Sequence, residues 1–180
     1  MLDSLIKLLN YYKKLGEKTF SQLDDEELFI EPAEGTNSIS VVVKHLHGNM
    51  LSRWTNFLEE DGEKVWRDRD GEFRSTIKSR EEMLQKWNEG WSCFFATLNE
   101  LKEVDFNRIV YIRNEGHTVI EAIHRQVAHY SYHVGQIVYL GKIIKGDAWE
   151  SLSVPRNKSQ AYNEKKFSEE VGQRHFTDDI

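Results

Sequence analysis

The chain has 180 residues, of which 39% are hydrophobic and 12% aromatic, a composition that indicates one globular domain and excludes a disordered chain. Its 24 Lys and Arg residues against 30 Asp and Glu residues give a net charge of -6 without a clustered basic block, so we expect no nucleic-acid partner. The single cysteine, Cys93, excludes an internal disulfide and a cysteine-based zinc site.

The first predicted element is an amphipathic helix, in which apolar residues recur at three- and four-residue steps between residues 2 and 23. Gly16 interrupts this stripe and predicts a weaker point in the helix. The segment carries lysines throughout and has no small-residue cleavage site, so it lacks the form of a secretory signal. No apolar run approaches the ~20 residues that span a bilayer. We therefore expect a cytoplasmic protein without a membrane partner.

Three further helices are predicted by apolar stripes over residues 38–60, 80–101 and 118–145. Two of their starts have the spacing of a capping box, in which a hydroxyl residue precedes a glutamate by three positions: Ser79 with Glu82, and Thr118 with Glu121. Four helices of about 20 residues with a common core favour an all-α, antiparallel four-helix bundle over residues 1–146.

The connections between these helices differ in character. Residues 61–79 read "DGEKVWRDRDGEFRSTIKS", which is too charged and too often punctuated by glycine for a core helix. "FNRIVYIRNEG" alternates polar with β-branched or aromatic residues and predicts a short β arm near residues 107–113. Residues 147–180 form a polar tail that we expect to pack on the bundle or fray from it.

Two histidines of the last helix, His129 and His133, stand four residues apart in "HYSYH" and share one helix face. Metal-binding helices use this spacing because the two rings can converge on one ion. Partly exposed polar residues that bind nothing are the alternative. No glutamate follows the first histidine, so the zinc-protease pattern is absent. On the helical wheel, His124 falls on the opposite side.

A third ligand is available in "KHLHGNM" of the second helix, which offers His45 and His47. His47 lies nearer to the apolar stripe. His45 shares its face with small residues that leave room for an ion or a ligand: Val41, Gly48 and Ser52. Periodicity alone leaves the choice open.

Together, "KHLHGNM" and "HYSYHVGQI" resemble the DinB/YfiT-like superfamily. The likeness extends to an uncharacterised DinB-like branch that is common in Bacillus-type bacteria, and it covers most of residues 35–165. The segments that resemble this branch are, in chain order, "NSISVVVKHL", "SRWTNFL", "DGEKVWRDRDGEF", "HRQVAHYSYHVGQIVYLGK" and "SLSVPRNKSQAYN".

The resemblance implies a four-helix bundle with one divalent metal ion, zinc or nickel by expectation, on His45, His129 and His133. The second histidine of "KHLHGN", His47, departs from the usual pattern of the superfamily. Some relatives are metal-dependent S-transferases that activate a low-molecular-weight thiol such as bacillithiol, which they transfer to an electrophile. The alternative is a non-catalytic metal-binding or stress-related interaction protein.

Two further expectations concern partners. Relatives commonly form homodimers, and the last helix has apolar residues beyond one stripe that suit such an interface: Val138, Leu140 and Ile144. Three arginines of the charged connection are candidates for recognising the acidic groups of a thiol, although solvated surface arginines are the alternative: Arg67, Arg69 and Arg74. Gln136, just after "HVG", is expected to be a packing residue, a partner of a metal ligand or a catalytic residue.

Overall fold

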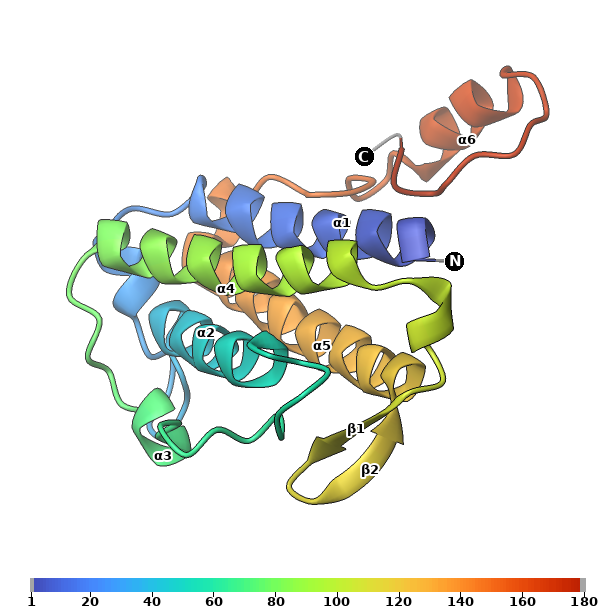
Figure 1. Ribbon diagram of the computed structural model, residues 1–180. Coiled ribbons are helices and arrows are strands. Elements are labelled where there is room, and N and C mark those ends of the chain that lie inside the picture. Colours follow the sequence, from blue (N-terminus) through green and yellow to red (C-terminus); the bar gives the residue numbers. More distant parts are fainter. Residues whose placement is uncertain (1, 179–180) are drawn as a thin grey trace.

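The computed structural model describes residues 2–178, and these residues are mostly helical with a small two-stranded sheet (Figure 1). The helices are α1 (Leu2–Phe20), α2 (Ile39–Trp54), α3 (Arg69–Glu72), α4 (Arg80–Glu100), α5 (Val119–Lys145) and α6 (Ser159–Phe167). The strands are β1 (Ile109–Ile112) and β2 (Glu115–Thr118), and short 3₁₀ turns lie at Glu26–Phe29, Glu103–Asp105 and Gly146–Ala148. Within residues 2–178, every helix is too short or too polar to cross a membrane.

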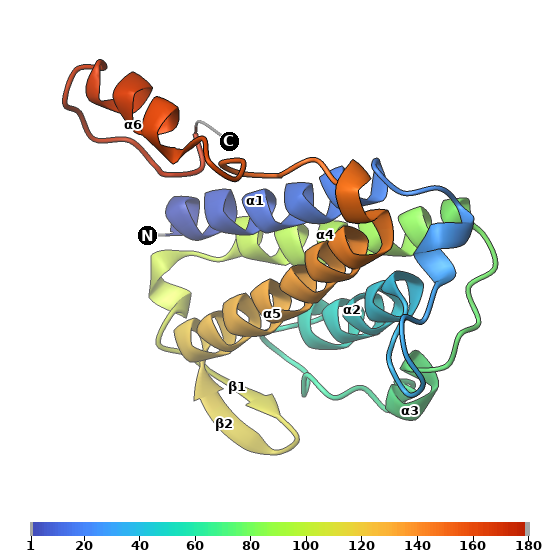
Figure 2. The ribbon, with the colours of Figure 1, turned by 180° about the vertical axis from the view of Figure 1, so that it is seen from behind.

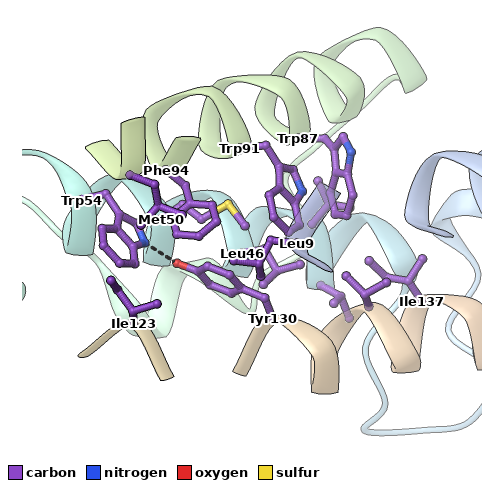
Figure 3. Packing of buried hydrophobic residues seen from close by; sticks show 14 of the residues in the cluster. Leu9, Leu46, Met50, Trp54, Trp87, Trp91, Phe94, Ile123, Tyr130 and Ile137 are labelled. Carbon is purple, nitrogen blue, oxygen red and sulfur yellow. Dashed lines mark hydrogen bonds between the residues drawn. The ribbon is translucent and has the colours of Figure 1, made fainter. Parts of the chain in front are cut away.

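The four long helices, α1, α2, α4 and α5, surround one hydrophobic core. Large aromatic side chains dominate it, and Trp54, Trp91 and Tyr130 are almost completely buried (Figure 3). The Trp54 indole Nε1 donates a hydrogen bond of 2.8 Å to the Tyr130 hydroxyl, which satisfies two polar groups inside the core. From behind, α5 lies between α1 and α2 (Figure 2). The apolar stripes of the sequence therefore meet in a single core.

Capping side chains set the starts of the helices where the sequence indicates them. Ser38 and Ser79 each accept a hydrogen bond from a backbone N–H three residues later. Thr118 and Glu121 form both bonds of a capping box at the start of α5. The predicted end of the second helix at residue 60 is wrong, because α2 stops at Trp54 and Asn56 adopts a positive φ of 49° that breaks the helical path.

Helix α1 runs unbroken through Gly16, so the weaker point predicted there does not interrupt the helix. A Cβ at this position would lie 2.6 Å from the ring of Trp87 on α4. The glycine is therefore required by the close approach of α1 to a buried tryptophan.

The predicted β arm is confirmed as an antiparallel hairpin, with Ile109 opposite Thr118 and Ile112 opposite Glu115. Arg113 and Asn114 form its two-residue turn with φ values of 58° and 63°. The Asp61 carboxylate accepts hydrogen bonds from both turn N–H groups, at 2.9 and 2.8 Å. The charged connection between α2 and α4 is thereby fastened to the hairpin.

The chain beyond α5 leaves the long helices, forms α6 at a distance from them and returns to α1 (Figures 1 and 2). On its return, His175 bonds to Ser4 at 3.1 Å and Asp178 pairs with Lys7 at 2.9 Å. The three apolar residues that suggested a dimer interface, Val138, Leu140 and Ile144, pack against the core of their own chain. They are only partly buried there, and the dimer stays a prediction.

Candidate metal centre

Three histidine rings from two helices meet at one point. The Nε2 atom of His129 lies 3.3 Å from Nε2 of His45 on α2 and 3.1 Å from Nε2 of His133, one turn further along α5. One ligand atom from each of the three residues can be chosen so that all lie within 4.8 Å of one another. Zinc–nitrogen bonds of 2.0–2.1 Å place tetrahedral ligand nitrogens about 3.3–3.4 Å apart. The spacing of the rings therefore suits one ion.

The rotation of α5 about its axis directs its two histidines toward α2. Tyr130, next to His129 in sequence, is completely buried and bonds to Trp54 and Asn49 on α2. Because Tyr130 is fixed in the core, His129 and His133 lie together at the edge of the core. His45 is buried, whereas His129 is partly exposed, so the three residues lie near the surface of the core.

Hydrogen bonds at the far side of two rings decide which nitrogen faces the centre. Nδ1 of His45 lies 2.9 Å from Oε2 of Glu72, and Nδ1 of His133 lies 2.8 Å from Oε1 of Gln136. Both oxygens accept, so each neutral ring carries its proton on Nδ1 and presents the lone pair of Nε2. Nδ1 of His129 is buried and has no hydrogen-bond partner within residues 2–178.

The protonation of two rings also suits a cation. Burial first, and then the nearness of His133 and His45, lowers the pKa of His129 to about 3. Burial and the nearness of His45 lower the pKa of His133 to about 4, although the bond to Gln136 opposes this shift. Both rings are therefore neutral at pH 7 and have lone pairs available for a metal ion.

Three other histidines lie outside this cluster. His47, the alternative to His45, uses its own Nε2 to bond to Glu89 of α4 at 2.9 Å. His124 is exposed on the outer side of α5, as the helical wheel indicates, and His175 bonds to Ser4 near the start of α1. Of the two histidines between which periodicity does not choose, His45 is therefore the one that lies with His129 and His133.

Sequence reasoning misses the residues that surround His45. Glu72, at the end of α3, is buried, and the Phe73 ring stacks on the His45 ring with centroids 4.7 Å apart. Burial alone would raise the pKa of Glu72, but hydrogen bonds from His45 and Arg67 and the charge of Arg67 outweigh it and lower the pKa. Glu72 and Phe73 both belong to the charged connection between α2 and α4, whose composition predicts a solvent-exposed segment. The one signal in the sequence is Gly48, a glycine inside a helix, because a Cβ there would overlap the Glu72 carboxylate.

The three candidate arginines of this segment also differ from one another. Arg67 is neither solvated nor open to a ligand, since its side chain is 1% exposed and bonds to both oxygens of Glu72. Arg69 lies at the surface, 3.5 Å from a carboxylate oxygen of Glu63. Arg74 is also exposed, and its carbonyl oxygen accepts a hydrogen bond from Lys44.

Comparison with known proteins identifies the family to which the chain belongs. A protein-family model described as "Protein of unknown function (DUF1572)" matches residues 1–158. The chain therefore belongs to this family. Neither the curated proteins nor the solved structures contain a match to it.

Proposed function

We propose that this chain is a divalent-metal protein that holds one ion, zinc or nickel, on His45, His129 and His133. The observation that carries the proposal is the convergence of three Nε2 atoms at separations of 3.1 and 3.3 Å. His45 and His133 present the lone pairs of Nε2 at this point, and a cation there would draw all three nitrogens toward itself. We further infer that the four long helices form an antiparallel bundle of the DinB/YfiT type, a likeness supported by the three-histidine pattern.

The reaction that we propose is transfer of a low-molecular-weight thiol, of the bacillithiol kind, to an electrophilic carbon. A divalent ion on three neutral imidazoles would lower the pKa of a bound thiol and keep positions open for it. In the transfer, the thiol proton goes to solvent, a sulfur–carbon bond forms, and the bond from that carbon to its leaving group breaks. The partial exposure of His129 is consistent with access for a small molecule.

The carboxylate beside the centre favours thiol transfer over hydrolysis by a bound water. Hydrolysis by a metal-bound water is assisted by a general base within hydrogen-bond reach of that water. Glu72 is the carboxylate that contacts a histidine of the centre, and its two oxygens already accept from Arg67 and His45. A thiol has a free pKa of about 8.5, far below that of water, so a bound metal ion would ionise it more completely and without such a base.

A panel assay tests the activity directly. Purified protein, loaded with zinc or with nickel, is incubated with bacillithiol, cysteine or glutathione and a set of alkyl and aryl halides and epoxides. Loss of one thiol with gain of its thioether, abolished by a chelator and restored by the metal, supports the transferase. Metal-loaded protein that turns over none of the thiols supports the alternative, a non-catalytic metal-binding protein.

A further inference from the structure

The charged connection between α2 and α4 encloses the His45 ring. Phe73 stacks on its face, with an angle of 25° between the two ring planes, and Glu72 Oε2 lies 2.9 Å from its Nδ1. The ring is therefore held by one face and one edge, and its remaining nitrogen, Nε2, is the atom that lies 3.3 Å from His129.

The Glu72 carboxylate is itself held in place by Arg67. Arg67 Nε donates to Oε1 at 2.7 Å and Nη2 donates to Oε2 at 3.0 Å, which is the bidentate geometry of a strong guanidinium–carboxylate pair. The side chains of Arg67 and Glu72 are only 1% and 6% exposed. Buried charges of this kind keep a fixed geometry, because any other arrangement leaves one of them unpaired.

Helix α2 is adapted to this carboxylate on both sides of His45. Three residues after it, Gly48 leaves the space that the Glu72 side chain fills, since a Cβ there would lie 2.8 Å from the carboxyl carbon. One residue before it, the Lys44 ammonium donates to the carbonyl oxygens of Gly71 and Arg74 at 2.6 and 3.1 Å, and so holds the end of α3.

We propose that Glu72, oriented by Arg67, is a positioning residue that fixes the tautomer and the direction of His45, so that its Nε2 faces the other two histidines. The inference rests on the proposed metal site. The physical reason is that a carboxylate accepts the Nδ1 proton, which leaves the lone pair on Nε2 and makes the imidazole a stronger donor to a cation. Without it the ring is free to take either tautomer.

The chain provides a matched control on the same helix. His47 and Glu89 make the same kind of bond at the same distance of 2.9 Å, but the Glu89 side chain is 54% exposed and the bond engages Nε2 of the histidine. Removing Glu89 therefore removes a histidine–carboxylate bond without disturbing the centre.

The first measurement is zinc affinity, by competition with a chromophoric chelator, for wild-type protein, Glu72→Ala, Glu72→Gln and Glu89→Ala. Loss of a hydrogen-bond partner behind a metal-bound histidine weakens affinity about 10- to 100-fold, which we expect for Glu72→Ala. Glu72→Gln keeps the size of the side chain but offers one oxygen to three N–H donors, two from Arg67 and one from His45. We expect it to weaken zinc binding about tenfold, and Glu89→Ala to stay within about twofold.

The second measurement is the tautomer of His45 in metal-free protein, by long-range ¹H–¹⁵N correlation spectra. We expect the Nδ1–H form in wild-type protein and in Glu89→Ala, and a mixture of both forms in the Glu72 variants. This readout reports on the ring itself and does not follow from a general loss of stability. If Glu72→Ala fails to fold because Arg67 is left unpaired, the zinc affinity and the His45 tautomer of Glu72→Gln test the role of Glu72.

The outcomes separate the two proposals. Zinc affinity and His45 tautomer that are unchanged in both Glu72 variants would overturn the role of Glu72 and leave the metal site standing. Wild-type protein that binds no zinc or nickel would overturn the proposed function, and the role of Glu72 toward a metal with it. Weaker zinc binding together with a mixed tautomer supports both.

Discussion

Two histidines of α2 that stand only two residues apart, His45 and His47, each bond to a carboxylate, and the two pairs lie in different environments. His45 and Glu72 are both buried, whereas the Glu89 side chain that pairs with His47 is 54% exposed. The two bonds have the same length of 2.9 Å, but His45 uses Nδ1 and His47 uses Nε2. Pairing with an acid is therefore no sign of a metal ligand by itself. What distinguishes His45 is that its free nitrogen faces two other histidines.

The largest difference between the two pairs is expected when the histidine of each pair is removed. We expect His45→Ala to lose zinc affinity about 100-fold or more, as His129→Ala and His133→Ala should, because two imidazoles alone fix neither the geometry nor the position of an ion. His47→Ala should stay within about twofold of wild-type protein, measured by the same chelator competition. Loss of metal in His47→Ala with retention in His45→Ala would reverse the assignment.

Two glycine substitutions give the next largest effect. Gly48→Ala should weaken zinc binding about tenfold, because the added Cβ displaces Glu72 although that residue is unchanged. Gly135→Ala, on α5 two residues after His133, is the control, since a Cβ there would have no atom within 4 Å. The control should leave zinc binding unchanged and raise the free energy of unfolding by about 0.5–1 kcal/mol in urea titrations, as helix propensity predicts. Equal zinc affinity in the two variants would contradict the account.

A smaller effect is expected from Lys44, which holds α3 from α2. Lys44→Met removes the ammonium that bonds to the carbonyl oxygens of Gly71 and Arg74. The loss of about 1 kcal/mol per hydrogen bond should loosen the segment from residue 61 to residue 79 and speed tryptic cleavage at Arg69 and Arg74 several-fold. Lys86→Met is the control, because its ammonium pairs with Glu82 of its own helix at 3.9 Å. Cleavage that is equally fast in both variants would contradict this role of Lys44.

The smallest effect on metal binding is expected from Asp61, the carboxylate that fastens the hairpin. Partial burial raises the pKa of Asp61, but backbone hydrogen bonds from Asn114, Glu63 and Arg113 outweigh it, so that the pKa falls below its ordinary value. A carboxyl group whose folded-state pKa is lowered stabilises the fold above its unfolded pKa of about 3.9, and this contribution is lost as the pH falls through the folded value.

Asp61→Asn should therefore unfold more easily than wild-type protein at pH 7, by about 1 kcal/mol, and the difference should shrink as the pH falls below about 4. Zinc affinity should not change, because Asp61 bonds to the hairpin turn and not to the residues around His45. Urea titrations at pH 7 and pH 3, with chelator competition at pH 7, measure both quantities. A stability difference that grows toward low pH would contradict the assignment.

The sequence predicts the long helices and two of the three clustered histidines, because both depend on local spacing. His129 and His133 share a face through the pitch of the helix alone, and the capping residues mark where their helix begins. His45 could not be chosen over His47 by periodicity, because α2 is buried on most of its surface and a helical wheel then distinguishes no single inward face. That choice depends on contacts with other segments.

Glu72 could not be predicted for a related reason. In a single sequence, a carboxylate among arginines reads as part of a solvated segment, and burial of such a group requires an arginine partner and an empty space to receive it. Arg67 and Gly48 provide these, but they lie 5 and 24 residues away from it in the sequence and meet only in the fold.

The most direct test of the central claim is the metal content of protein purified without an affinity tag, measured by mass spectrometry of the elements beside a His133→Ala variant prepared in the same way. We predict close to one equivalent of zinc or nickel in wild-type protein and less than about a tenth of that in the variant, because one of three ligands is missing. The same small amount of metal in both proteins would contradict the three-histidine centre.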